Sequence, residues 1–234
     1  MKVGSLYDSF IQAVQRKRKL LAILLDPEKF EIDHTAAFLR KLPKEASHIF
    51  VGGSTVPEGS THALVKQLKL FTAKPIMLFP GDISQITPEA DGLLFLSLLS
   101  GDNPEYLIGQ QVKSVPKIYG TSLEVIPTGY ILIDGEQQSA VERVTHTSPI
   151  LQQEVQKIVH TAKAGEYMGK KLIYLEAGSG AKTPVSKTII SEVKKQLSIP
   201  LIVGGGIRTS EALQDAYDAG ADLVVMGTAF EESL

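Results

Sequence analysis

The hydrophobic positions of this chain fall into short continuous runs that are separated by longer polar stretches. A run of roughly four to eight apolar residues without polar alternation is typical of a parallel strand that is covered on both faces. Eight such runs occur, at residues 20–26, 48–52, 75–79, 92–97, 129–134, 171–177, 200–205 and 222–227. The pattern therefore predicts eight buried strands in a parallel sheet.

Stretches with helical periodicity join most of these runs. Residues 183–197 have an apolar face and a polar face, with Thr183 suited to cap the helix and Pro184 to occupy its first position. Residues 209–220 show the same periodicity, and Gly220 fits a helix C-terminus. The alternation of strands and helices predicts repeated βα units.

Eight βα units in a chain of 234 residues have the size of one TIM (β/α)8 barrel. We therefore predict an α/β fold with a single TIM-barrel domain over residues 1–234 and an extra N-terminal helix over residues 5–19. Residues 80–90 leave no room for a full third helix, so we expect an irregular segment or a single turn there. The chain also ends soon after Gly227, so the eighth helix is expected to be truncated or missing. A doubly wound sheet uses the same alternation and is the competing architecture, but the even spread of the strands favours the barrel.

Composition and charge exclude several classes of function. A net charge of -2 and a pI near 6.2 give no basic footprint for nucleic acid, and the short basic run at residues 16–19 is expected to be a solvated helix end. The absence of cysteine excludes disulfides, thiolate metal sites and cysteine nucleophiles, and it suits a reducing cytoplasm. The five histidines have no metal-binding spacing. The apolar runs are too short to span a bilayer, and no secretory signal precedes them.

Glycines follow the last two predicted strands. Gly204, Gly205 and Gly206 come at the end of the seventh strand, and Gly227 with Thr228 comes at the end of the eighth. TIM-barrel enzymes commonly bind a phosphate with these two loops, because glycine lets the backbone approach the anion and the next helix offers free N–H groups. We interpret the two loops as the sides of a phosphate site. Tight turns without a ligand are the alternative.

An acidic residue, Glu176, ends the sixth predicted strand, on the face where barrel enzymes carry out chemistry. The small residues Ala177, Gly178, Ser179 and Gly180 follow it and leave space for a ligand. A carboxylate in this position can act as a general base toward a hydroxyl group. A structural glutamate that accepts hydrogen bonds from backbone amides is the alternative.

A second acidic residue, Asp26, ends the first predicted strand, where Pro27 stops the strand. Asp-Pro is also a common turn, so this signal alone is weak. The hydroxyl groups of Ser54 and Thr55 follow the second strand. Because Mg²⁺ is usually held by few protein oxygens together with water and substrate phosphates, Asp26 with Ser54 predicts a site for a magnesium diphosphate.

Six motifs in this order, LLDPEK, VGGST, GYILI, YLEAGSGA, VGGGIRT and VMGTAF, resemble the geranylgeranylglyceryl phosphate synthase family, including its bacterial members. They extend over nearly the whole chain, and YLEAGSGA together with GGGI and GTA is more specific than any single motif. The resemblance implies a prenyltransferase on a TIM barrel. Such an enzyme joins geranylgeranyl diphosphate to the 3-hydroxyl of sn-glycerol 1-phosphate through an ether bond and releases diphosphate.

The resemblance also implies roles for individual residues. It assigns the glycerol phosphate site to Tyr174, Leu175, Glu176, Ala177, Gly178, Ser179, Gly180, Gly205, Gly206, Gly227 and Thr228. Asp26 and Ser54 match the Mg²⁺ positions, while Glu176 matches the catalytic base and Tyr174 helps to position the reacting groups. Leu24 departs from some bacterial relatives, which have a lysine there; this places the chain with the archaeal-like branch and removes one expected phosphate contact.

The implied chemistry agrees with the residues. Magnesium at Asp26 would neutralise the diphosphate as the allylic C–O bond breaks, and Glu176 would take the hydroxyl proton. No DDxxD sequence occurs, so a helical chain-elongating prenyl synthase is not expected. Residues 93–112 are a candidate wall for the groove of the prenyl tail, although core packing explains most of their leucines equally well.

Two other functions stay open from the residues alone. The chain could be a phosphate-binding isomerase or synthase of the amino-acid or thiamin pathways, which uses the same glycine loops, or a non-catalytic barrel that binds a phosphorylated metabolite. The resemblance implies a homo-oligomer, because family members are usually dimers or larger rings. Peripheral contact with a membrane is also open, since the product is a lipid, although nothing in the sequence forms an anchor.

Overall fold

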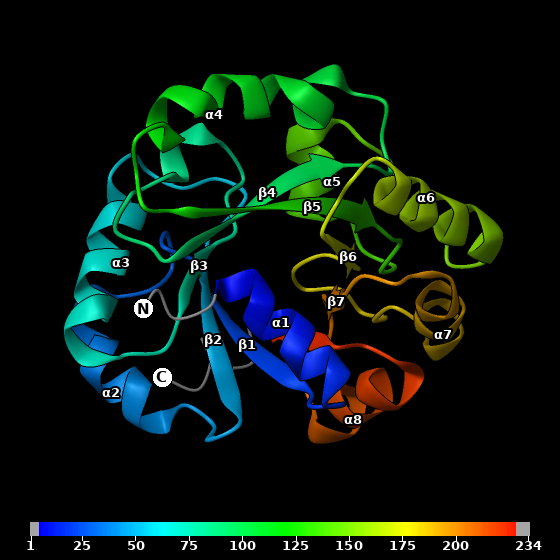
Figure 1. Ribbon diagram of the computed structural model, residues 1–234, viewed down its shortest axis with the longest axis horizontal. Coiled ribbons are helices and arrows are strands. Elements are labelled where there is room, and N and C mark those ends of the chain that lie inside the picture. The colour runs from blue at the N-terminus through cyan, green and yellow to red at the C-terminus, as the bar shows by residue number, and fades with distance from the viewer. Residues whose placement is uncertain (1–4, 228–234) are drawn as a thin grey trace.

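The barrel is present in the computed structural model, which describes residues 5–227. Within this range eight parallel strands close into a ring in chain order (Figure 1). They are β1 (Leu20–Leu25), β2 (Ala46–Val51), β3 (Ile76–Leu78), β4 (Gly92–Leu98), β5 (Glu124–Leu132), β6 (Leu172–Glu176), β7 (Leu201–Gly204) and β8 (Leu223–Met226). The last strand pairs with the first, with Leu223 opposite Leu20. The predicted TIM barrel is confirmed, and the doubly wound alternative is wrong because the sheet has no open edge.

Helices pack around the strands, apart from α1, which lies across one end of the barrel (Figure 1). They are α1 (Leu6–Gln15), α2 (Thr35–Lys41), α3 (Ser60–Phe71), α4 (Gln110–Ile118), α5 (Ala140–Thr145), α6 (Val155–Tyr167), α7 (Lys187–Gln196) and α8 (Ser210–Ala219), with 3-10 turns η1 (Ile32–His34) and η2 (Ile83–Gln85) and a π-helical turn η3 (Glu105–Gly109). The N-terminal helix α1 is confirmed, and its residue Leu6 donates its N–H to Glu124 at the start of β5. Between β3 and β4 lies only η2, which confirms the predicted irregular segment. Residues 228–234, where a truncated or missing eighth helix was expected, lie outside the described residues.

The core has two layers because successive side chains of a strand point to opposite faces. In β6, Leu172 and Tyr174 point into the barrel, whereas Ile173 and Leu175 pack in the layer between the barrel and the helices. The same alternation turns Glu176 inward at the end of β6.

The start of α7 differs from the prediction. The helix begins at Lys187, and its cap is Ser186, whose hydroxyl accepts from Ile189 N. Thr183 is not the cap, because it lies in the loop before the helix. The N–H groups of Lys182 and Thr183 donate to Gly135 O, which holds this loop against the segment after β5. The predicted C-terminus of α8 is confirmed, since Gly220 caps it with φ 120°.

Strand β5 begins at Glu124 rather than at residue 129. Pro127 hid this extension, because a proline cannot donate to the ladder and usually argues against a strand interior. Its carbonyl nevertheless accepts from Lys171 N at 2.7 Å, which joins β5 to the start of β6.

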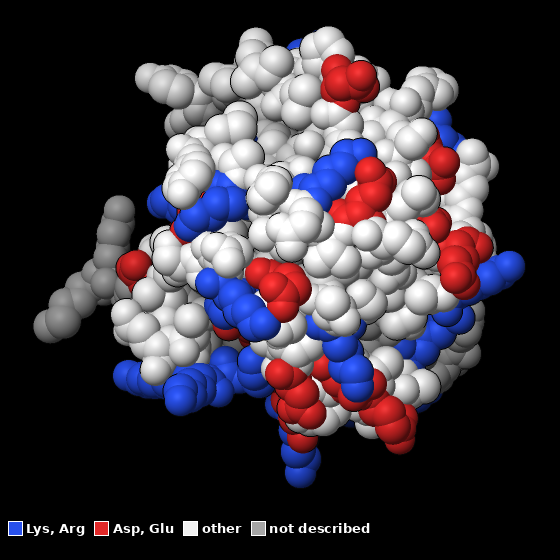
Figure 2. Space-filling model, turned by 90° about the vertical axis from the view of Figure 1, so that its right-hand side faces the viewer, with Lys and Arg blue, Asp and Glu red and all other residues white. Residues whose placement is uncertain are grey.

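Surface charge is mixed on the face that carries α6, α7 and α8. Figure 2 shows acidic and basic side chains intermixed there, with no broad field of one sign. Ion pairs join several of them, for example Lys163 with Glu166 and Lys187 with Asp215. Residues 5–227 contain no helix that combines the length and the apolar sequence of a membrane span.

A buried histidine in β2 makes stability depend on pH. His48 is 4% exposed and stacks on Phe10 at 5.0 Å between ring centroids. Burial, together with the nearby charges of Arg18 and Lys74, lowers the pKa of His48 from 6.5 to about 4. The unfolded chain therefore binds more protons between these values, and the free energy of unfolding falls as pH drops through this window, by about 3 kcal/mol in full.

This prediction is checked by urea unfolding of the wild type and of His48→Gln at several pH values from about 4 to 7.5. We expect the acid loss of stability to be smaller in the variant by roughly the amount above. A matched His34→Gln variant, whose side chain is 56% exposed in the wild type, should follow the wild-type curve. Parallel curves for all three proteins would contradict the prediction.

Candidate active site

A cavity of about 490 Å³ lies at the C-terminal ends of the strands. Each strand or the residue after it contributes to its wall, through Leu24, Gly52, Phe79, Leu98, Tyr130, Glu176, Gly205 and Gly227. This is the end of a TIM barrel where active sites are found. The cavity extends toward η2 and α4, where Ile83, Ile86, Phe95, Gln110 and Ser114 line it. The absence of a full helix between β3 and β4 leaves this extension open.

Glu176 is the buried acid of the cavity. It is 7% exposed, and its Oε1 accepts from Gly178 N at 2.8 Å. Burial raises the pKa of Glu176 from 4.5 to about 7, against the opposing effects of the nearby Tyr174 hydroxyl and of the hydrogen bond from Gly178 N. A carboxylate with a pKa close to neutral is suited to accept a proton at physiological pH.

Two tyrosines and a phenylalanine stand beside this carboxylate. Tyr174 lies two residues before Glu176 on the same face of β6, and Phe79 stacks on it at 5.1 Å. Tyr130 of β5 tilts against Tyr174 at 5.4 Å. Burial and the charge of Glu176 raise the pKa of both tyrosines well above 10, so both hydroxyls stay protonated and can donate. The Tyr174 hydroxyl lies near Glu176 but has no hydrogen bond of good geometry within residues 5–227.

The loops after β6 and β7 meet at the cavity. Gly180 has φ 79°, Gly205 has φ 83° and Gly206 has φ 72°, conformations that a side chain strains. A Cβ on Gly205 would lie 2.5 Å from Glu176 Oε1 and 2.6 Å from Gly178 N. The two loops are therefore packed at backbone distance. Ser179, Gly180, Gly205, Gly206 and Gly227 all line the cavity, while Thr228 lies outside the described residues.

Three residues of the predicted ligand set, Leu175, Ala177 and Gly178, do not line this cavity, and their contact with a ligand stays a prediction. The Leu175 side chain is buried in the outer core, because its strand neighbours take the inward positions. Ala177 is also in the outer core, and its N–H donates to Gly204 O at 3.1 Å. The N–H of Gly178 is used by Glu176. These residues hold β6, β7 and the carboxylate in place.

The first acid lies on another side of the cavity. Asp26 accepts from Glu28 N at 3.0 Å and lies 3.5 Å from Lys29 Nζ. Gly53 presses against it, since a Cβ there would be 2.5 Å from Asp26 Oδ1. Ser54 lines the cavity with Asp26. Residues 5–227 contain no group of three or more acidic, histidine or cysteine ligands, so a cation here would need substrate oxygens. One carboxylate with hydroxyl groups is a donor set that fits Mg²⁺.

Several residues that line the cavity were not predicted from the sequence. Lys29, Arg143 and Arg208 bring positive charge to the wall, and Gln137 adds an amide. They lie in loops or on the short helix α5, where single polar residues have no periodicity that marks them. Arg208 could have been predicted, because it lies next to the glycines of VGGGIRT. Tyr130 could also have been predicted, because the strand GYILI points alternate side chains inward and outward and Tyr130 takes an inward position.

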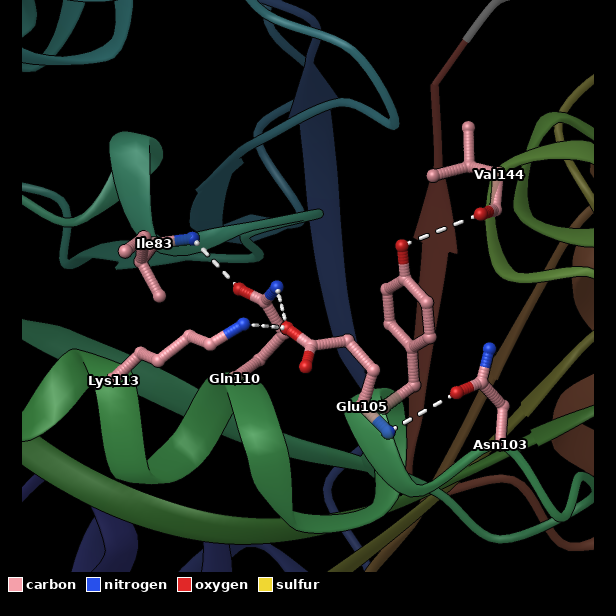
Figure 3. A network of polar contacts seen from close by, with 7 residues as sticks. Ile83, Asn103, Glu105, Gln110, Lys113 and Val144 are labelled. Carbon is pink, nitrogen blue, oxygen red and sulfur yellow. Dashed lines mark hydrogen bonds and ion pairs between the residues drawn. The ribbon is translucent and has the colours of Figure 1, made fainter.

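Polar contacts tie three walls of the cavity together (Figure 3). Gln110 Oε1 accepts from Ile83 N of η2 at 3.3 Å, and Gln110 Nε2 donates to Glu105 Oε1 at 2.6 Å. The Tyr106 hydroxyl donates to Val144 O of α5 at 3.3 Å. The turn η3 and the start of α4 thus hold both η2 and α5.

Comparisons with known proteins agree with one another. The chain matches the PcrB family over residues 12–234. It is 57% identical over 224 residues to the geranylgeranylglyceryl phosphate synthase of Zunongwangia profunda, covering 96% of each chain. It is 37% identical over 235 residues to the protein of that name from Pyrococcus furiosus, covering 100% of this chain and 92% of that one. The crystal structure of (S)-3-O-geranylgeranylglyceryl phosphate synthase from Thermoplasma acidophilum in complex with substrate sn-glycerol-1-phosphate has a TM-score of 0.90 and 32% identity, covering 99% of this chain and 94% of that one.

Proposed function

Because the chain belongs to the PcrB family, we propose that it joins a polyprenyl diphosphate to the 3-hydroxyl of sn-glycerol 1-phosphate through an ether bond. As a member of that family it is a prenyltransferase of the geranylgeranylglyceryl phosphate synthase type. The observation that carries the proposal is Glu176, a buried carboxylate with a pKa raised to about 7 that shares one cavity with the glycine loops.

The glycine loops supply the site for glycerol phosphate. Gly180, Gly205 and Gly206 let the backbone approach the phosphate closely, and Arg208 adds a positive charge beside them. With the phosphate held there, the proposed role of Glu176 requires the 3-hydroxyl to lie toward its carboxylate. The neutral tyrosine hydroxyl of Tyr174 can donate to substrate oxygens and fix their orientation.

The chemical step needs one proton acceptor and one leaving group. The glycerol oxygen forms the new bond to C1 of the prenyl chain, its proton passes to Glu176, and the bond between C1 and the diphosphate oxygen breaks. Asp26 and Ser54 would hold Mg²⁺, which supplies positive charge for the departing diphosphate. Lys29 adds a further positive charge on that side of the cavity.

The extension between η2, β4 and α4 is the proposed groove for the prenyl tail. Its wall includes Ile83, Ile86, Phe95 and Leu96, so it can cover a hydrocarbon chain. The length of the tail, the homo-oligomer, the cytoplasmic location and peripheral membrane contact stay predictions.

A product assay tests the proposed function. Purified protein receives Mg²⁺, radiolabelled sn-glycerol 1-phosphate and geranylgeranyl diphosphate, or a shorter or longer prenyl diphosphate. We expect label to move into a lipid phosphate that extracts into organic solvent, and we expect none with EDTA or with the sn-glycerol 3-phosphate enantiomer. Binding of glycerol phosphate without product under any substrate pair would instead favour a non-catalytic barrel. Turnover of an aromatic or ribosyl phosphate alone would favour an isomerase or synthase.

The pKa of Glu176 predicts how turnover depends on pH. The carboxylate accepts a proton only when ionised, so kcat should rise tenfold per pH unit at acid pH and level off near pH 7. Steady-state rates at saturating substrates, from about pH 5 to 9, measure this bend. The control is Tyr174→Phe, which removes a nearby hydroxyl that lowers the pKa of Glu176 and should move the bend to higher pH. Titration of the substrate phosphate would give a bend that this variant leaves in place.

A further inference from the structure

A buried glutamine in η2 has no role in the chemistry above. Gln85 is 1% exposed, and a glutamine is rarely so buried unless its amide is paired. Both ends of its amide bind the same residue. Gln85 Oε1 accepts from Gly53 N at 3.1 Å, and Gln85 Nε2 donates to Gly53 O at 2.7 Å.

These two bonds continue the sheet beyond the ends of its strands. The last ladder bonds in this region run from Gly52 N to Leu25 O at 3.1 Å and from Phe79 N to Val51 O at 2.8 Å. Gly53 comes next, after β2 has ended. There the side chain of Gln85 takes the place of a neighbouring strand and holds both polar groups of the peptide backbone.

Gly53, the residue that Gln85 holds, lies next to both proposed cation ligands. Gly53 presses on Asp26, where a Cβ would come within 2.5 Å of Oδ1, and it immediately precedes Ser54. The position of Gly53 therefore sets both the carboxylate and the start of the loop that carries the Ser54 hydroxyl. Mg²⁺ requires near-ideal octahedral geometry at about 2.0–2.1 Å, so small shifts of this backbone matter.

A glycine in the same segment supports this interpretation. Gly81 lies so close to the loop that a Cβ there would be 2.4 Å from Gly53 O and 3.1 Å from Gln85 Nε2. The segment after β3 is thus packed against the loop after β2 at backbone distance. This contact requires a tight turn between β3 and β4 that brings Gln85 back to Gly53. It does not require a full helix there.

We propose that Gln85 is a positioning residue for the magnesium diphosphate site of Asp26 and Ser54. It touches neither cation nor substrate and acts through the backbone of Gly53. This inference rests on the proposed function, because that function supplies the diphosphate. It assigns the irregular segment between β3 and β4 a second task besides leaving room for the prenyl tail.

The test measures binding by calorimetry and so does not depend on turnover. Mg²⁺ is titrated into the protein with inorganic diphosphate present, and sn-glycerol 1-phosphate is titrated separately. In Gln85→Met the affinity for magnesium diphosphate should fall by roughly 10- to 100-fold, as for other residues that orient metal ligands, while the affinity for glycerol phosphate stays within about twofold. Gln85→Asn, which keeps the amide but is too short to reach both groups of Gly53, should show the same selective loss and guards against a variant that fails to fold.

The matched control is Gln152→Met, a glutamine that does not line the cavity and whose amide accepts from Ser186 N and donates to Asp134 O and Pro184 O, far from the loop after β2. It should leave magnesium diphosphate binding unchanged. The inference is overturned if folded Gln85 variants bind magnesium diphosphate like the wild type, or if they lose both ligands to the same extent. The wild-type titration separates this result from failure of the proposed function, since a wild type that binds no magnesium diphosphate contradicts the proposed function itself.

Discussion

Replacing Glu176 by glutamine is expected to lower kcat by roughly 100- to 10,000-fold while the dissociation constant for sn-glycerol 1-phosphate stays nearly unchanged. Glutamine has the same shape, and its carbonyl oxygen can still accept from Gly178 N, so the loop after β6 keeps its position. The amide cannot take up the hydroxyl proton, however, and the loss therefore falls on the chemical step. Single-turnover rates and calorimetry measure the two quantities separately.

Glu176→Asp is the matched variant for this prediction. It keeps a carboxylate but withdraws it by one methylene group, so its kcat should lie between those of the wild type and of Glu176→Gln. Turnover that is unchanged in Glu176→Gln would remove Glu176 from the role of base. A parallel loss of glycerol phosphate affinity would assign it to binding instead.

Stability provides an independent check that Glu176→Gln is folded. The pKa of Glu176 is about 7 in the folded state against 4.5 as the ordinary value, so the folded chain binds more protons between these limits. The Glu176 carboxyl group therefore contributes about 3 kcal/mol to the free energy of unfolding below pH 4.5. This contribution is lost as pH rises through 7. The variant lacks this loss, and its stability relative to the wild type should therefore increase with pH across that window.

The barrel could be predicted from the sequence because its strands are buried on both faces. Continuous apolar runs such as residues 20–26 and 222–227 need no knowledge of tertiary contacts to be recognised. The end of each run then marks the C-terminal face of the barrel, which is why Asp26 and Glu176 were found and why both line one cavity. The glycine loops were found for the same reason.

Features that depend on contacts between distant loops could not be predicted. The start of α7 is one, because the N–H of Thr183 bonds to Gly135 and the helix begins only after this loop. The direction of Leu175 is another: a motif names consecutive residues, but a strand turns every second one away from the cavity. Gln85 is the third, since a glutamine in an irregular segment has no sequence signal until the structure brings it to Gly53.

Gly205→Ala is expected to lower kcat/KM for sn-glycerol 1-phosphate by roughly a hundredfold or more, because a misplacement of about 1 Å at a reacting group has an effect of this size. Gly205 has φ 83°, and its Cβ would come within 2.5 Å of Glu176 Oε1 and 2.7 Å of Ala177 N. The loops after β6 and β7 must move apart to admit the methyl group, which displaces both the carboxylate and the phosphate site. The left-handed backbone adds roughly 1–2 kcal/mol of strain.

Gly169→Ala separates the two effects, because Gly169 has φ 84° but no atom within 4 Å of its Cβ. It should lose only the stability that the backbone strain costs, measured by thermal unfolding, and keep its activity. Equal activity in the two variants would contradict the role given to the packed loops.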